Sequence, residues 1–319
     1  MADSGPGNSG EGWERKVLEK VALAAINEQR ASRRWGVLFK SLVLVYLFAV
    51  LFIGMGWIKR GDYKSPGKHT AMVELRGVIA AEGLASADNV TSGLQAAFKD
   101  SNTQGVILRI NSPGGSPVQA GYINDEIKRL RALHPNIPIY AVIEDICASG
   151  GYYVAVAADK IYVDKASIVG SIGVVMDGFG FTGTMEKLGV ERRAITAGSN
   201  KKFLDPFSPV NPAHQEYAEK MLSEIHQQFV AVVRAGRGQR LKETPDLFSG
   251  LVWVGSKSIE LGLTDGLGGV ESVARDVIKA EDIVDFTPRE NIAERVARKF
   301  GATMAETLLK LSSGGAQLR

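Results

Sequence analysis

The sequence of 319 residues predicts an α/β fold preceded by one transmembrane helix. Its composition, 45% apolar and 23% charged, is that of an ordinary globular protein. Near the N-terminus, a run of eighteen residues contains no charge. Beyond residue 70, short apolar runs alternate with segments of helical periodicity, which is typical of sheets covered by helices.

The N-terminal part divides into three segments. Residues 1–34 form an N-terminal segment with a polar amphipathic helix expected over Trp13–Arg34. Residues 35–58 form the predicted transmembrane anchor, because the charge-free run Ser41–Ile58 is just long enough to span a bilayer. The alternative, a buried core helix, rarely lacks a polar face over this length. Residues 59–70 have the composition of a linker.

Charge is unevenly distributed between the two parts of the chain. The net charge is +3, and residues 1–70 hold 11 Lys and Arg against 6 Asp and Glu, whereas the remainder holds 27 against 29. The later part therefore lacks the clustered basic charge expected of a nucleic-acid surface. Basic residues flank the apolar run on both sides, so their count does not fix the membrane orientation.

Residues 71–289 form the predicted main domain. Its expected strands are Val73–Ile79, Gly105–Asn111, Ile137–Ile143, Lys160–Val163 and Arg192–Thr196, and its expected helices are Leu84–Lys99, Val118–Leu133, Ser149–Ala158 and Pro212–Arg234. Residues 290–319 form a C-terminal tail in which Glu290–Leu311 is expected to be an amphipathic helix. In such a domain, ligand sites are expected where strands give way to helices.

Cysteine and histidine usage argues against a metal enzyme. The single cysteine, Cys147, cannot form an intrachain disulfide and is expected to be a small buried side chain. The histidines show no metal-site spacing; they are His69, His134, His214 and His226. A zinc enzyme is therefore not expected.

Two strand-to-helix junctions are candidate sites. Asn111-Ser-Pro-Gly-Gly-Ser116 has adjacent glycines that let backbone N–H groups face a bound oxygen, although a plain tight turn would look the same. In the second junction, Ser149 precedes two glycines at the start of a helix. A hydroxyl there meets unpaired N–H groups, which favours a nucleophile, but an N-cap serine with no further role fits equally well.

A nucleophilic Ser149 would need a base. No histidine lies in a motif, and the chain has no Gly-x-Ser-x-Gly elbow, so a Ser-His-Asp triad is disfavoured. A lysine can serve if its pKa is lowered from about 10.4 by roughly 3 units, which burial can supply.

These junctions belong to a set of ordered motifs that resembles the signal peptide peptidase A (SppA) family in its short form, membrane-bound serine peptidases with a Ser-Lys dyad. The resemblance covers about residues 72–275. The matching motifs are Val73-Glu-Leu-Arg-Gly-Val-Ile79, Arg109-Ile-Asn-Ser-Pro-Gly-Gly115, Ala148-Ser-Gly-Gly-Tyr-Tyr153, Ala158-Asp-Lys-Ile161, Gly170-Ser-Ile-Gly-Val174, Ala197-Gly-Ser-Asn-Lys201, Val252-Trp-Val-Gly255 and Leu261-Gly-Leu-Thr-Asp-Gly-Leu-Gly-Gly269.

The resemblance implies a role for particular residues. Ser149 corresponds to the nucleophile and Lys201 to the general base, with Lys202 as a solvated neighbour. Ser171 corresponds to a serine that orients the lysine amine, although it could be a turn hydroxyl with no further role.

Gly114 and Gly150 correspond to the backbone donors of an oxyanion hole. The implied fold is the Clp-protease/crotonase-like spiral of β-β-α units. The implied assembly is a ring-shaped homo-oligomer, such as an octamer, in which Ser and Lys can come from neighbouring subunits.

The same resemblance implies a serine endopeptidase that hydrolyses cleaved signal peptides and other apolar peptides. Its implied location is the bacterial inner membrane, in contact with lipid, with residues 1–34 in the cytoplasm, the catalytic domain outside the cytoplasm and no nucleic-acid partner. The resemblance implies no metal or organic cofactor. Two alternatives belong to other classes. One is a crotonase-like acyl-CoA enzyme that uses Glu144 or Asp145 as acid and base, and the other is a catalytically silent membrane scaffold.

Overall fold

A computed structural model describes residues 11–54 and 67–288. The chain divides into two compact units, one of residues 64–289 and one of residues 1–63 with 290–319. The C-terminal helix predicted over Glu290–Leu311 lies outside the described residues.

The N-terminal segment forms one continuous helix, α1, from Glu11 to Gly54. The sequence predicted separate helices on either side of residue 35, and the structure has no break there. The end of the predicted anchor, residues 55–58, lies outside the described residues. Among the described residues, no helix has both the length and the hydropathy needed to cross a membrane, so the structure does not support the predicted transmembrane helix.

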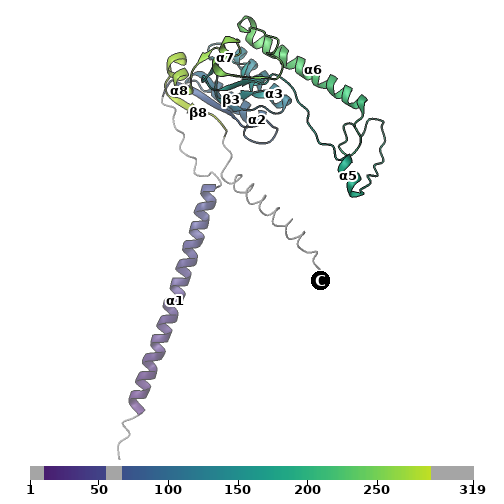
Figure 1. The fold of residues 1–319 in the computed structure, drawn as a ribbon. Coiled ribbons are helices and arrows are strands. Elements are labelled where there is room, and N and C mark those ends of the chain that lie inside the picture. The colour runs from purple at the N-terminus through teal and green to yellow at the C-terminus, as the bar shows by residue number, and fades with distance from the viewer. Residues whose placement is uncertain (1–10, 55–66, 289–319) are drawn as a thin grey trace, which may run out of the picture. The chain divides into compact units, whose positions relative to one another are not determined.

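The main unit is built on an eight-stranded sheet (Figure 1). Its strands are β1 (His69–Arg76), β2 (Thr103–Ser112), β3 (Ile139–Ala148), β4 (Lys160–Val163), β5 (Ile168–Gly170), β6 (Val252–Val254), β7 (Gly266–Leu267) and β8 (Ile283–Asp285). The order is β6-β5-β3-β2-β1-β8, with β4 pairing β3 and β7. All pairings are parallel except that of β5 with β6, which confirms the predicted mixed α/β class.

The strand β3 is the central element, because two different strands pair with its two halves. Its first half pairs with β4, and its last three residues pair with β5. The sheet therefore forks along β3, and the chain leaves β3 at Ala148, directly before Ser149.

The helices close to the sheet are α2 (Ala87–Lys99), α3 (Pro117–Leu133), α4 (Gly150–Ala155), α6 (Pro212–Arg237), α7 (Gly255–Glu260) and α8 (Val270–Ser272), with a 3₁₀ turn at Gly238–Arg240 and a π-helical turn at Val273–Ile278. Serine caps fix where two of them begin. The hydroxyls of Ser86 and Ser116 accept hydrogen bonds from backbone N–H groups three residues later. One face of α3 is buried, as its predicted periodicity requires, and contributes Ile123 and Ile127 to the core.

Residues 174–211, here called the arm, leave the sheet after Gly173 and return as α6 (Figure 1). The arm contains α5 (Thr182–Leu188), and none of its side chains is fully buried. The strand predicted over Arg192–Thr196 is not formed. Ile195 is 101% exposed, so the alternating pattern there has no sheet to pack against.

The arm is held together by contacts among its own residues. Phe181 stacks on Phe207 with ring centroids 5.4 Å apart, and Arg192 lies over the Phe207 ring at 5.2 Å. Arg192 also pairs with Asp205, whose pKa lies below its usual range because of that bond and a second one from Ser208. These contacts give the arm a defined shape without a hydrophobic core.

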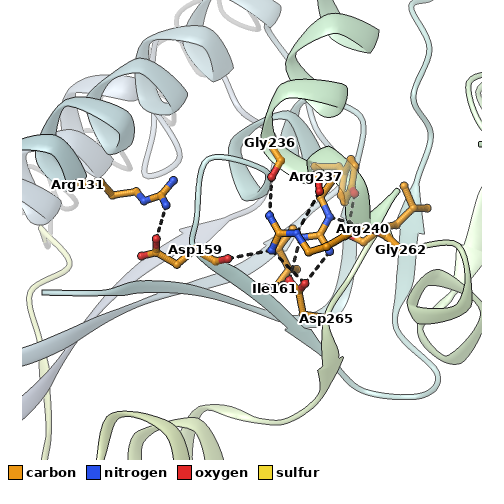
Figure 2. Close-up of polar contacts among 10 residues, drawn as sticks. Arg131, Asp159, Ile161, Gly236, Arg237, Arg240, Gly262 and Asp265 are labelled. Atoms are coloured by element: carbon orange, nitrogen blue, oxygen red, sulfur yellow. Dashed lines mark hydrogen bonds and ion pairs between the residues drawn. The ribbon is translucent and has the colours of Figure 1, made fainter. Parts of the chain in front are cut away.

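The C-terminal end of α6 is fixed to the sheet by a buried ion pair (Figure 2). The guanidinium of Arg237, 1% exposed, donates to both oxygens of Asp265 and to the carbonyl of Gly262. Asp265 also accepts the N–H of Ile161 in β4 and a bond from Arg240. Figure 2 shows these groups converging on the Asp265 carboxylate. Because every charged group in the cluster is paired, it stabilises the junction instead of leaving a charge exposed to the apolar core.

Candidate active site

Ser149 lies at the turn from β3 into α4 with a strained backbone. Its φ is +52°, a left-handed value that is uncommon for a residue with a side chain. The turn is held because the N–H of Ser149 donates to the Gly170 carbonyl at 2.8 Å and its carbonyl accepts from Tyr153 at 3.0 Å. The Tyr153 bond continues into α4, so sheet and helix together fix the position of Ser149.

The Ser149 hydroxyl does not cap α4. The serine occupies the N-cap position, but its side chain makes no capping hydrogen bond. The interpretation of Ser149 as a plain N-cap residue therefore lacks its defining contact. The hydroxyl is left available for chemistry.

The Ser-Pro-Gly-Gly loop after β2 packs directly on Ser149. A Cβ added to Gly114 would lie 2.7 Å from the Ser149 Cβ and 2.7 Å from the Gly150 nitrogen, closer than any side chain can approach. One added to Gly115 would lie 2.1 Å from the carbonyl oxygen of Ile79. Both positions have a left-handed φ. Glycine is therefore required twice, for backbone conformation and for close approach.

The two glycines differ in what their N–H groups do. The N–H of Gly114 donates to the hydroxyl of Ser112 at 3.2 Å, and that hydroxyl donates to the Gly77 carbonyl. Within the described residues, the N–H groups of Gly115 and Gly150 make no hydrogen bond, and both glycines line the cavity at Ser149. Gly115 is thus a candidate oxyanion donor that the sequence did not single out. Two adjacent glycines in a sequence give no signal as to which N–H group faces the site.

The cavity at Ser149 has a volume of about 360 Å³. Ser171 lines it from the turn after β5, where the Ser171 φ of +51° is again left-handed. The apolar part of its wall comes from Tyr153, Val174, Val175, Ile225 and Phe229. The structure thus brings together Ser149, Ser171 and Gly150 in a cavity that fits an apolar side chain.

Lys201 is not among the residues that line this cavity. It lies in the arm, where its side chain is exposed, and the neighbouring Lys202 lines a separate cavity within the arm. The side chain of Lys201 is not buried in the isolated chain. The assignment of Lys201 as the base therefore stays a prediction.

The carboxylates considered for acyl-CoA chemistry lie elsewhere. Glu144 and Asp145 line a second cavity of about 710 Å³, which does not include Ser149. Glu144 forms an ion pair with Arg109, which also pairs with Glu74 at 3.0 Å. Asp145 accepts a hydrogen bond from Asn111 at 2.7 Å. These carboxylates are engaged in charge pairs and hydrogen bonds away from the candidate oxyanion donors.

Thiol and metal chemistry find no support at this site. Cys147 is fully buried, and burial raises the pKa of its thiol, so it is not poised as a thiolate nucleophile. Within residues 11–54 and 67–288, no group of three His, Cys, Asp or Glu side chains is placed to bind a metal ion.

Comparison with known proteins places this site in a family. Residues 131–283, which include Ser149, match the model of peptidase family S49. The chain is 31% identical to "Putative protease slr0021" of Synechocystis over 65% of its own length and 72% of that protein. It is 29% identical to "Putative signal peptide peptidase SppA" of Enterococcus faecium, over 74% of its own length and 71% of that protein.

A higher identity is found within a much longer protein. The chain is 44% identical over 209 residues to a protein of Brucella melitensis named "Na(+)/H(+) antiporter NhaA". The match covers 64% of the chain but only 28% of that protein.

Proposed function

The chain belongs to peptidase family S49, the SppA-like family, and on this premise we propose that it is a serine endopeptidase with Ser149 as its nucleophile. The observation that carries the proposal is the uncapped Ser149 hydroxyl, held in a strained turn beside the N–H groups of Gly115 and Gly150. Donors placed in this way stabilise the oxyanion that forms when a serine attacks a peptide carbonyl.

The chemistry is acyl transfer in two stages. A neutral lysine amine removes the Ser149 proton, the alkoxide attacks the carbonyl carbon, and the amine then protonates the leaving nitrogen. Water activated by the same amine hydrolyses the acyl-enzyme. Ser171, which lines the same cavity as Ser149, would orient the amine through its hydroxyl.

We assign the base role to Lys201, supplied by the arm of a neighbouring copy. Lys201 is exposed in its own chain's arm and does not line its own chain's Ser149 cavity. A ring-shaped homo-oligomer would let each arm reach the next subunit. Entry into that subunit's cavity would bury the amine and lower its pKa, as a lysine base requires.

Apolar peptides, including cleaved signal peptides, are the proposed substrates. The support is the apolar wall beside Ser149, to which Tyr153 and Phe229 contribute with ring centroids 5.2 Å apart. A wall of this kind selects substrates by the size of an apolar side chain. The crotonase-like alternative is disfavoured because Glu144 and Asp145 line a different cavity.

Attachment to the inner membrane, with the main unit outside the cytoplasm, is a further part of the proposal and rests on the sequence. Its support is the charge-free run Ser41–Ile58. Apolar side chains along the preceding part of α1 are exposed, among them Trp35 and Phe39. Carbonate extraction of membranes, followed by protease protection of intact cells, tests both attachment and orientation. Release of the chain by carbonate would contradict this part.

The catalytic proposal is tested by cleavage of an apolar fluorogenic peptide by the full chain. Ser149→Ala and Lys201→Ala are expected to lower kcat by at least about 10³-fold, because both groups act in the same proton transfer. Lys202→Ala is the matched control, since it removes an equal charge one residue away, and it is expected to retain activity.

Each unexpected result has a distinct meaning. Retained cleavage by Ser149→Ala would show that the nucleophile is assigned wrongly. Loss of cleavage in Lys202→Ala but not in Lys201→Ala would assign the base role to Lys202 in place of Lys201. A folded but inactive wild type would favour the silent scaffold.

A further inference from the structure

The base of the arm is closed by a hydrogen bond between residues 54 positions apart. The Nε2 atom of His226, in α6, lies 3.2 Å from the carbonyl oxygen of Ile172. A carbonyl oxygen only accepts, so Nε2 carries the proton and donates. Ile172 is fully buried and lies two residues before the arm begins, whereas α6 starts where the arm ends.

The turn that receives this bond also positions the catalytic groups. The carbonyl of Gly170 accepts the Ser149 N–H, and the Ser171 N–H donates to the Leu251 carbonyl at 2.7 Å. The Gly173 N–H folds back onto the Ser171 carbonyl at 2.9 Å. A non-glycine residue with the left-handed φ of Ser171 persists only when its surroundings hold it there.

The side chain of His226 provides a link that the rest of α6 does not. Its helix neighbours Ile225 and Phe229 line the Ser149 cavity as apolar wall. Among the hydrogen bonds of the described residues, the one from His226 joins α6 to the turn formed by residues 170–173. The carbonyl of Ile172 is therefore tied to the same helix that shapes the cavity wall.

We propose that His226 is a positioning residue for peptide hydrolysis, which holds the Ser171 turn at the base of the arm through its Nε2–H bond to the Ile172 carbonyl. This inference rests on the proposed peptidase function. Losing the bond leaves Ser171 free to leave the cavity wall and loosens the Gly170 carbonyl that fixes Ser149. The arm that carries Lys201 starts at the same turn. The direction in which the arm leaves the main unit therefore changes when this turn moves.

Three variants of the full chain separate this role from general packing. His226→Leu removes the donor, His226→Gln keeps an N–H donor at a similar reach, and Gln227→Leu alters the adjacent, exposed position of the same helix. With a fluorogenic apolar peptide, His226→Leu is expected to lower kcat about 10- to 100-fold with little change in KM, since small misplacements of catalytic groups have effects of this size. His226→Gln is expected to recover most of the loss, and Gln227→Leu to match wild type.

Two results with an active wild type would overturn the assignment. One is an unchanged kcat in His226→Leu, and the other is an equal loss in the Leu and Gln variants, which would trace the effect to ring packing. Hydrogen–deuterium exchange of the segment 168–174 gives a readout that needs no activity. The amides of Ser171 and Gly173 are expected to exchange faster in His226→Leu than in wild type. Unchanged protection would overturn the inference, whereas an inactive wild type with the expected exchange would count against the peptidase function alone.

Discussion

Two regions of the main unit carry the proposed catalytic groups, and they differ in how the fold holds them. Ser149 leaves a buried strand, and backbone bonds to Gly170 and Tyr153 fix it from both sides. Lys201 lies on an arm that has ring stacking and ion pairs but no buried apolar side chain. A single chain therefore fixes the position of the proposed nucleophile, Ser149. It does not bring the proposed base, Lys201, to the same cavity.

Under the proposed function, this difference predicts a catalytic unit that is larger than one chain. A hydroxyl next to backbone N–H groups needs only local geometry, which one sheet and one helix supply. A lysine base needs burial to lose its charge, and an exposed arm supplies that only when it enters another surface. Four expected outcomes test the comparison between the Ser149 region and the arm, beginning with the largest.

Mixed oligomers give the largest expected effect. A 1:1 mixture of Ser149→Ala and Lys201→Ala chains, assembled together, is expected to recover about a quarter of wild-type activity, because random neighbours in a closed ring pair an intact serine with an intact lysine at that frequency. The measurement is peptide cleavage by the mixture against each variant alone. If mixed oligomers form, as shown by two affinity tags on one particle, and no activity returns, Ser and Lys belong to the same chain.

The second-largest effect is expected from alanine substitutions at glycines, which should lower activity near Ser149 but not in the arm. Gly115→Ala is expected to reduce cleavage by about 10²-fold or more, because its Cβ would lie 2.1 Å from the Ile79 oxygen and displace an oxyanion donor. Gly183→Ala in α5 is the matched control, since a Cβ there meets nothing within 4 Å. The control is expected to keep activity within about twofold, as is usual for alanine in an open helical position. Equal losses in both variants would remove the contrast.

Ion pairs in the arm should contribute less to the free energy of unfolding than the buried ion pair at the end of α6. Arg237→Met is expected to lower the free energy of unfolding by about 3 kcal/mol, because the Asp265 carboxylate loses its buried ion-pair partner and keeps only the more exposed Arg240. Arg192→Met breaks an Arg–Asp pair in the arm where Arg192 is 38% exposed, and a much smaller loss than in Arg237→Met is expected. Urea unfolding of the full chain, followed by circular dichroism, measures both. A large loss for Arg192→Met would show that the arm is part of the cooperative core.

The smallest expected effect is on the pH dependence of the free energy of unfolding. Burial raises the pKa of Asp265, but the hydrogen bonds and charge of Arg237 lower it by more than burial raises it. The net pKa therefore lies below its usual value. A carboxyl with a depressed pKa stabilises the fold above its unfolded pKa of about 3.9, and that stability is lost as the pH falls through the folded pKa. The free energy of unfolding should therefore fall with decreasing pH less steeply in Asp265→Asn than in wild type. Asp205→Asn in the arm removes a second carboxyl with a lowered pKa and should also flatten the slope, and a slope in Asp265→Asn equal to that of wild type would contradict the assignment.

The sequence predicted most of what a buried periodic pattern can encode. The strand Lys160–Val163 has its predicted bounds, and α3 begins one residue before its predicted start. The strand predicted over Arg192–Thr196 is wrong because Ile195 has no sheet to face, and a local pattern carries no information about its partner. The strands β5 to β8 have two or three residues each, too few for any periodicity to be recognised.

The candidate site was predictable in type but not in every atom. The resemblance pointed to Ser149 and Ser171, which line one cavity. It also pointed to Gly114, whose N–H is engaged by Ser112, whereas Gly115 lines the cavity and its N–H makes no hydrogen bond among the described residues. His226 could not be found from sequence, because a histidine within an amphipathic helix gives no sign of which carbonyl it will meet.

The length of α6 has a consequence for assembly. With 26 residues and a rise of 1.5 Å for each, the helix is about 39 Å long and is anchored at one end by Arg237. The other end of α6 carries the arm, so the length of the helix sets how far the arm extends. In the proposed ring, this length would therefore set the distance between neighbouring subunits. Inserting seven residues before His226 would move the arm outward by about 10 Å while nearly preserving the helix face. In the proposed ring, such a chain would keep an intact nucleophile but would carry Lys201 about 10 Å away from the neighbouring cavity.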